Sequence, residues 1–125
     1  MDLNILIVDD SAAIRKILIR ALAQTELPIG QVHEASDGLE ALKILGSSQV
    51  RLVLSDINMP NMDGLQLLKQ LRGTPNWKDL SVVMITTEGS QAKVLEAVEL
   101  GAKGYLRKPF TADQIKEKVL TCLGQ

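Results

Sequence analysis

The chain has 125 residues, with 15 acidic and 14 basic side chains, one histidine and one cysteine. This length fits one domain over residues 1–125, and a single cysteine excludes an internal disulfide bond and a cysteine-rich zinc site. A net charge of −1 argues against a general nucleic-acid-binding protein. No apolar run reaches the ~18 residues of a membrane span, and the first apolar run lacks the basic flank of a signal peptide. We therefore expect a cytoplasmic protein with neither a nucleic-acid nor a membrane partner.

Short apolar segments along the chain predict strands over residues 5–8, 32–35, 52–55, 82–86 and 104–106. The first, third and fourth of these are continuous and rich in β-branched residues, which is typical of strands buried on both faces. The second and fifth are shorter and more polar, as edge strands often are. Because the chain has only three aromatic side chains, the core must be aliphatic.

Each predicted strand is followed by an amphipathic segment with apolar side chains at helical spacing. Residue types that cap helices stand before these segments, at Ser11, Asp37, Asp63, Ser90 and Thr111. Five strand–helix units in succession predict an α/β fold, a parallel sheet with helices on both faces. They fit an open flavodoxin-like sheet with strand order 2-1-3-4-5 better than an eightfold barrel, and ligands of such sheets lie beyond the carboxyl ends of strands 1 and 3.

Three acidic side chains stand at that predicted position: Asp9 and Asp10 after the first strand, and Asp56 after the third. Two carboxylates ~4 Å apart repel by roughly 4 kcal/mol at an effective dielectric constant of 20. A hard divalent cation, most simply Mg²⁺, would relieve this repulsion. The alternative for any one of these residues is a solvated loop acid that caps a helix.

Two further polar residues follow neighbouring strands, Thr86 at the end of the fourth and Lys108 after the fifth. Both open onto the same edge of the sheet as the acids. A hydroxyl and an ammonium beside a metal-bound carboxylate suit a phosphoryl group, with the carboxylate as nucleophile. For either residue considered singly, the alternative is that it has no such role: Lys108 would be a surface lysine and Thr86 an ordinary strand residue.

Four motifs in this order resemble the receiver domains of response regulators, and the resemblance covers the whole chain. They are Val8-Asp9-Asp10-Ser11, Asp56-Ile57-Asn58-Met59-Pro60-Asn61-Met62-Asp63-Gly64, Thr86, and Lys108-Pro109-Phe110. The resemblance implies a phosphorelay protein and not a conventional enzyme, with phosphorylation from a phosphodonor and autodephosphorylation as its only reactions. Asp56 resembles the phosphoacceptor, which takes the phosphoryl group from a CheA-like sensor histidine kinase.

The resemblance also assigns the metal site. Asp10 is implied as a direct Mg²⁺ ligand, Asp9 as a ligand acting mainly through water, and Asn58 as the donor of a backbone carbonyl beside Asp56. Asn58 and Glu88 are implied to set the lifetime of the phosphoryl group, because polar side chains there orient the attacking water.

For the switch, the resemblance implies that Lys108 pairs with the phosphoryl oxygens and that its bond to Pro109 is cis. Thr86 resembles the switch hydroxyl, and Tyr105 the aromatic side chain whose rotamer follows it. Gly64 fits a turn that needs an unusual backbone conformation. Thr87 stands where many relatives have a smaller residue, which leaves its effect on access to the site open.

No output domain follows the last predicted helix, so we expect a stand-alone monomer that acts by binding a partner. The expected target is the flagellar motor switch protein, or another protein, on the face formed by helix 4, strand 5 and helix 5. That face carries Lys93, Arg107 and Lys118. A separate phosphatase is a further partner that the resemblance allows.

Three alternatives stay open from the sequence. The resemblance implies chemotaxis as the pathway, and one alternative is a receiver that regulates a pathway other than motility. The second is an aspartate-nucleophile phosphatase, although that class places its nucleophile and general acid two residues apart, whereas Asp9 and Asp10 are adjacent. The third is a flavin carrier on the same fold, although the two acids would repel its phosphate.

Overall fold

The computed structural model describes residues 3–86 and 91–122, in which five strands alternate with five helices. The strands are β1 (Leu3–Val8), β2 (Ile29–Ala35), β3 (Leu52–Asp56), β4 (Ser81–Thr86) and β5 (Gly104–Arg107). The helices are α1 (Ala12–Gln24), α2 (Gly38–Ser47), α3 (Gly64–Arg72), α4 (Gln91–Glu99) and α5 (Ala112–Cys122). Every predicted strand is present and slightly longer than expected. No helix within these two ranges is long and apolar enough to cross a membrane.

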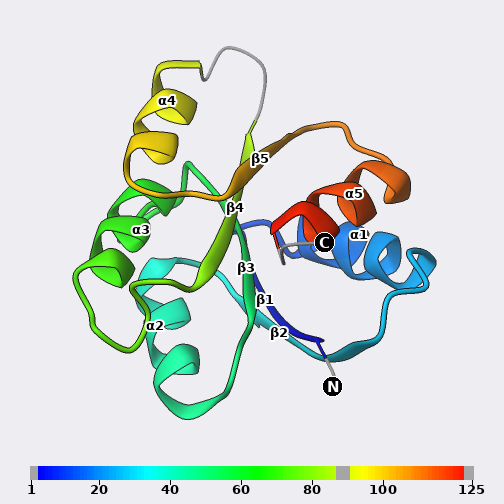
Figure 1. The fold of residues 1–125 in the computed structure, drawn as a ribbon, viewed down its shortest axis with the longest axis horizontal. Helices are drawn as coiled ribbons and strands as arrows, with labels where there is room; N and C mark the ends of the chain where they lie inside the picture. The colour runs from blue at the N-terminus through cyan, green and yellow to red at the C-terminus, as the bar shows by residue number, and fades with distance from the viewer. Residues whose placement is uncertain (1–2, 87–90, 123–125) are drawn as a thin grey trace.

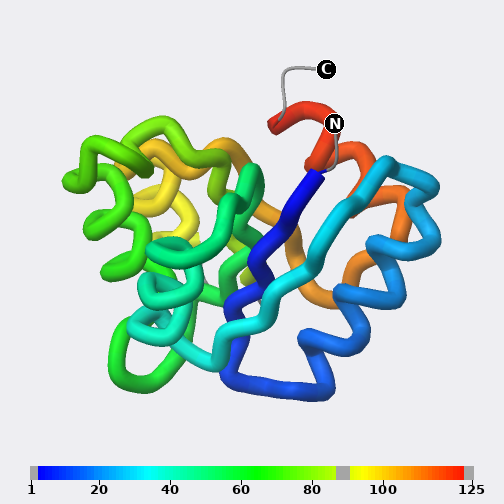
Figure 2. Tube along the Cα trace, turned by 90° about the horizontal axis from the view of Figure 1, so that it is seen from below, coloured from blue at the N-terminus to red at the C-terminus, as the bar shows by residue number. Residues whose placement is uncertain are grey.

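The strands form one parallel sheet in the order β2-β1-β3-β4-β5, which confirms the predicted topology. Figure 1 shows the sheet nearly edge-on, with α1 and α5 on one face and α2, α3 and α4 on the other. Figure 2 shows the same two layers from below, with β1 beside β2. Because consecutive strand–helix units all run the same way, every strand points its carboxyl end to one edge of the sheet.

The core consists of two aliphatic clusters, one on each face of the sheet. Successive side chains of a strand point to opposite faces, so β1 contributes Leu6 to the α2–α4 side and Ile7 to the α1–α5 side. Both side chains are fully buried. The expected aliphatic core is confirmed, and Cys122 lies in it on the α5 side.

Helix caps fix where the chain leaves each strand end. Ser11 and Asp37 accept hydrogen bonds from backbone N–H groups of the first turns of α1 and α2. Asp63 forms a reciprocal capping box with Gln66 at the start of α3, and Thr111 caps α5. These four predicted caps are confirmed, whereas Ser90 lies outside the described residues. Each cap anchors a loop at the carboxyl edge of the sheet, which positions the polar side chains there.

Candidate functional site

Three carboxylates meet at the carboxyl ends of β1 and β3. Asp9 and Asp10 directly follow β1, and Asp56 is the last residue of β3. The two strands are hydrogen-bonded neighbours, with Val8 opposite Ser55. One oxygen from each of the three carboxylates lies within 4.8 Å of the other two. The convergence expected from the strand order is therefore present.

The three acids differ in burial and in hydrogen bonding. Asp9 is only 1% exposed, and its Oδ1 accepts a hydrogen bond of 2.9 Å from the backbone N–H of Ser11. Asp56 is 9% exposed, and its Oδ1 accepts one of 2.8 Å from the backbone N–H of Ile57. Asp10 is exposed to solvent. The site thus has a buried floor and one acid at its open edge.

Lys108 brings the positive charge to this cluster. Its Nζ lies 3.3 Å from Asp9 Oδ2 and 3.8 Å from Asp56 Oδ1. The backbone N–H of Lys108 donates to the carbonyl of Thr86 over 2.8 Å, which holds the start of the β5–α5 loop against the end of β4. The bond between Lys108 and Pro109 is cis, as the resemblance implied.

The electrostatics of the cluster leave an excess of negative charge. Burial raises the pKa of Asp56 above its ordinary value of 3.8. The ammonium of Lys108 opposes that rise in pKa, whereas the charges of Asp9 and then Asp10 add to it. One ammonium cannot balance three carboxylates, and the oxygen donors are those that hard divalent cations prefer. The residues therefore fit a Mg²⁺ ion.

Thr86 and Tyr105 lie on the two strands beyond β3. Thr86 ends β4 and is 4% exposed, and in the ladder Asp56 stands opposite Ile85, the residue before it. Tyr105 on β5 is 46% exposed, and the Nζ of Lys118 lies 5.6 Å from the centre of its ring. The structure thus holds the tyrosine in an outward position, with the hydroxyl-bearing residue buried near the acids.

The sequence-based explanation of Gly64 is wrong. The non-glycine residue of the β3–α3 loop with positive φ is Asn61, at 65°, and Gly64 is not among the residues with that conformation. A Cβ on Gly64 would instead lie 3.0 Å from the Cα of Ile57 and closer still to the carbonyl oxygen of Asp56. Glycine is needed here because α3 begins in contact with the backbone of the acceptor residue.

Two contacts at the site were missed from the sequence. Arg15 on α1 donates from Nη1 to the carbonyl oxygen of Asp9 over 2.6 Å and pairs with Glu34 through Nε over 2.9 Å. Lys93, which was predicted on the face formed by helix 4, strand 5 and helix 5, donates to Oδ1 of Asn58 in the β3–α3 loop. Neither contact has a sequence signal, because each depends on how a long side chain crosses between elements.

Two residues singled out earlier, Glu88 and Thr87, lie outside the described residues. The expectations attached to them, the lifetime of the phosphoryl group and access to the site, stay predictions.

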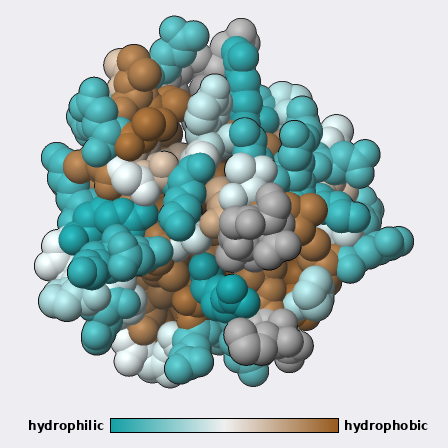
Figure 3. Space-filling model, in the orientation of Figure 1, coloured by the Kyte–Doolittle hydropathy of each residue, from teal (hydrophilic) through white to brown (hydrophobic). Residues whose placement is uncertain are grey.

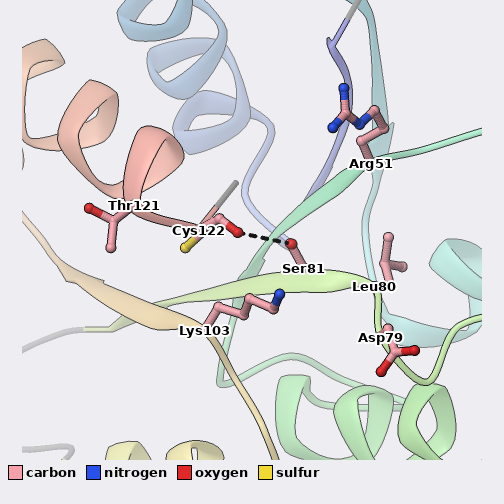
Figure 4. A pocket seen from close by; sticks show the side chains of 7 residues that line it. All are labelled: Arg51, Asp79, Leu80, Ser81, Lys103, Thr121 and Cys122. Carbon is pink, nitrogen blue, oxygen red and sulfur yellow. Dashed lines mark hydrogen bonds between the residues drawn. The ribbon is translucent and has the colours of Figure 1, made fainter. Parts of the chain in front are cut away.

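A separate pocket of about 510 Å³ lies at the opposite, amino-terminal edge of the sheet. Figure 4 shows Arg51, Lys103 and Asp79 around Ser81, whose hydroxyl donates to the carbonyl of Cys122 over 3.4 Å. Charges of both signs line this pocket, and none of the acids of the carboxyl edge contributes to it. The residues for which phosphoryl chemistry was predicted from the sequence lie at the other end of the strands.

The fold and the acidic site together define a phosphorelay receiver, and comparison with known proteins agrees. The family model of the response regulator receiver domain matches residues 5–120. The chain belongs to the response regulator receiver domain family.

Several of the relatives and solved structures that resemble the chain carry chemotaxis names. A chemotaxis protein CheY homolog of Campylobacter jejuni is 39% identical over 123 residues, which cover 98% of this chain and 93% of the relative. Chemotaxis protein CheY1 of Helicobacter pylori is 38% identical and is covered to 98%, as is this chain. The solved structure of the chemotaxis response regulator CheY4 of Vibrio cholerae matches with a TM-score of 0.86 and 32% identity, covering 98% of this chain and 99% of that one.

Proposed function

We propose that this receiver takes a phosphoryl group onto the carboxylate of Asp56 and switches the binding of a partner protein. The proposed donor is the phosphohistidine of a CheA-like sensor histidine kinase, and the proposed compartment is the cytoplasm. The observation that carries the proposal is the position of Asp56, at a strand end, nine-tenths buried, with Lys108 Nζ 3.8 Å from Oδ1. Membership in the receiver family supports it.

The transfer itself asks little covalent chemistry of the protein. A carboxylate oxygen of Asp56 forms a bond to phosphorus, the bond from phosphorus to the donor nitrogen breaks, and the imidazole leaves with the electron pair. Because the ammonium of Lys108 already lies 3.8 Å from Asp56 Oδ1, it would be close to the oxygens of a phosphoryl group on Asp56. The carboxylates of Asp9, Asp10 and Asp56 and the backbone carbonyl of Asn58 would hold Mg²⁺. When bound, this ion would neutralise charge on the phosphoryl oxygens.

We propose that Thr86 and Tyr105 carry the signal outward. A phosphoryl oxygen on Asp56 offers Thr86 a charge-assisted hydrogen bond, worth roughly 1.5–3 kcal/mol, which is enough to shift a two-state equilibrium tenfold or more. Movement of the Thr86 hydroxyl toward Asp56 leaves space for the ring of Tyr105 to turn inward. The outward tyrosine of this structure is then the resting position.

The partner surface proposed from the sequence lies on α4, β5 and α5. On α4, Leu95 is 66% exposed and Val98 is 51% exposed, and Figure 3 shows apolar surface gathered over that helix. Beside it, a groove of about 610 Å³ between β5 and α5 is lined by Tyr105, Lys108 and Lys118 among others. Since the ammonium of Lys108 also lies 3.3 Å from Asp9 and 3.8 Å from Asp56, this one side chain connects the acids to the groove.

Chemotaxis is the proposed pathway, because the similar curated proteins of Campylobacter jejuni and Helicobacter pylori are named chemotaxis proteins. The flagellar motor switch protein is accordingly the proposed target, and a separate phosphatase a further partner. A phosphatase activity of the chain itself is disfavoured, since Asp9 and Asp10 are adjacent, whereas an aspartate-nucleophile phosphatase places its nucleophile and general acid two residues apart.

Phosphorylation with a small donor tests the proposal. Wild-type protein incubated with acetyl phosphate and Mg²⁺ should take up acid-labile phosphate, and Asp56→Asn should take up none. Asp79→Asn is the matched control, because it removes an exposed acid at the other edge of the sheet and should change nothing. Undiminished uptake by the Asp56 variant would refute the assignment.

A further inference from the structure

A lysine on α4 is hydrogen-bonded to the loop that follows the proposed phosphoacceptor. Lys93 stands in the first turn of α4, and its ammonium donates to Oδ1 of Asn58, two residues after Asp56. A cation is unfavourable at this end of a helix, because the macrodipole places partial positive charge there. The lysine is thus poorly placed for the stability of α4 alone, and its bond to Asn58 offsets that cost.

This contact fixes which end of the Asn58 amide is free. A lysine ammonium has donors and no acceptor, so only the carbonyl oxygen of the amide can face it. The NH₂ group of Asn58 is therefore directed away from Lys93. An amide that rotated freely would present either end to a water molecule beside Asp56, whereas the held amide presents one.

The rest of the β3–α3 loop is anchored on the opposite side, to the start of α2. The side chain of Asn61 donates to Asp37 Oδ2 over 2.8 Å. The backbone N–H of Gly38 donates to the carbonyl of Met62 over 3.0 Å. Lys93 adds a tie from α4 on the other side, so the position of α4 and the orientation of Asn58 are linked through one hydrogen bond.

We propose that Lys93 is a positioning residue for the loss of the phosphoryl group, acting through Asn58. The inference rests on the proposed function, in which Asn58 orients the attacking water. In that step a water oxygen bonds to phosphorus, and the bond between phosphorus and the Asp56 oxygen breaks. The carboxylate leaves with the electron pair, and the proton of water passes to solvent. Because Lys93 belongs to α4, a partner that moves this helix changes the lifetime of its own signal.

Decay of the phosphorylated protein tests this role. After loading with acetyl phosphate and Mg²⁺ and removal of the donor, Lys93→Met should lose phosphate about threefold more slowly than wild type, the scale of one exposed charged hydrogen bond. Lys16→Met, which removes an exposed lysine of α1, is the charge-matched control and should decay as wild type. Lys93→Arg keeps a donor and should restore most of the rate.

The double variant separates positioning from a general loss of structure. If Lys93 acts through Asn58, Asn58→Ala should also slow decay, and adding Lys93→Met to it should change nothing more. Wild-type decay in Lys93→Met, or effects of the two substitutions that multiply, would overturn the proposal.

A measurement without phosphate keeps the two proposals apart. In the unmodified protein, the side-chain NH₂ resonances of Asn58 in a ¹⁵N–¹H spectrum should shift in Lys93→Met and not in Lys16→Met. Failure of wild type to take up phosphate would refute the proposed function alone. Unshifted Asn58 resonances would refute the contact, whatever the uptake.

Discussion

The two edges of the sheet are built from the same parallel strands but differ in the sign and burial of their charges. At the carboxyl edge, Asp9 and Asp56 are buried with like charge, and Lys108 is the ammonium beside them. At the amino edge, Arg51, Lys103 and Asp79 are exposed charges of mixed sign. Folding alone favours the second arrangement, since solvated charges cost little. The crowded acids of the carboxyl edge are therefore a cost that function explains.

Helix direction accounts for part of this difference. In alternating strand–helix units, every helix begins near the carboxyl edge and ends near the amino edge. The partial positive charge of the helix N-termini consequently faces the acids, and the partial negative charge of the C-termini faces Arg51 and Lys103. The helix dipoles thus lower the free-energy cost of acids at the carboxyl edge and of cations at the amino edge. They do not neutralise the three carboxylates of Asp9, Asp10 and Asp56.

The largest expected effect is a loss of stability when a side chain is added at Gly64, where α3 contacts the backbone of the carboxyl edge. Gly64→Ala would press a Cβ into the backbone of Asp56 and Ile57, and backbone cannot yield as a flexible side chain does. We expect a loss of about 2–4 kcal/mol in the free energy of unfolding, measured by urea denaturation. Gly46→Ala is the control, since nothing lies within 4 Å of its Cβ position and a helical alanine stabilises by up to about 1 kcal/mol. Equal stability of the two variants would contradict the close-contact explanation.

The next effect concerns the proposed coupling between Asp56 and the ring of Tyr105 through Thr86. The chain has one tyrosine and one tryptophan, so ¹⁹F-labelled tyrosine reports on Tyr105 alone. Beryllofluoride with Mg²⁺ should shift this resonance in wild type, and Thr86→Ala should lower the equilibrium constant between the shifted and unshifted forms about tenfold or more, the worth of the lost hydrogen bond. Labelled Trp77 serves as the control probe, and it should respond little in either protein. A full Tyr105 shift in the variant would remove Thr86 from the switch.

Removing the exposed acid should separate binding from folding. Asp10→Ala should weaken Mg²⁺ binding about tenfold in a calorimetric titration, because it removes one ligand. It should also raise the free energy of unfolding of the metal-free protein by about 1 kcal/mol, because it relieves repulsion with the neighbouring acids. Asp79→Ala at the amino edge should leave Mg²⁺ affinity unchanged. Identical affinity in both variants would exclude Asp10 from the metal site.

The smallest effect is a dependence of stability on pH without metal. Since the folded state raises the pKa of Asp56 above 3.8, protonated Asp56 favours folding, and this stabilisation is lost as pH rises through the raised pKa. With a chelator present, the stability of wild type relative to Asp56→Asn should therefore fall as pH rises from the ordinary carboxyl range to neutrality. Added Mg²⁺ should reduce the difference at neutral pH. A difference that is constant with pH would contradict the raised pKa.

The strands, their order in the sheet and the proximity of the three acids could be predicted from the sequence for one physical reason. Strands buried on both faces leave continuous apolar runs, and the residues that directly follow them must lie at the same edge of a parallel sheet. Asp9 and Asp56 are placed by that rule alone. The helix caps at Ser11 and Asp63 could also be predicted, because a short polar side chain at this position accepts a hydrogen bond from a backbone N–H of the helix that follows it.

Side chains that cross between elements were not predictable in this way. The partners of Arg15 and Lys93 depend on the path of a loop and on the rotamer of a long side chain, which no local pattern encodes. Gly64 shows a third case, in which the sequence identified the residue but not the reason. A close approach between two backbones and a positive φ both select glycine, and only the structure tells them apart.

Chemical mapping of the modified residue tests the central claim most directly. Protein loaded from acetyl phosphate with Mg²⁺ is reduced with borohydride, which converts an aspartyl phosphate to homoserine, and the altered residue is located by peptide mass spectrometry. Homoserine should appear at position 56, with Asp9 and Asp10 intact. Homoserine at either of those acids, or unaltered Asp56 in protein that carries phosphate, would contradict the assignment.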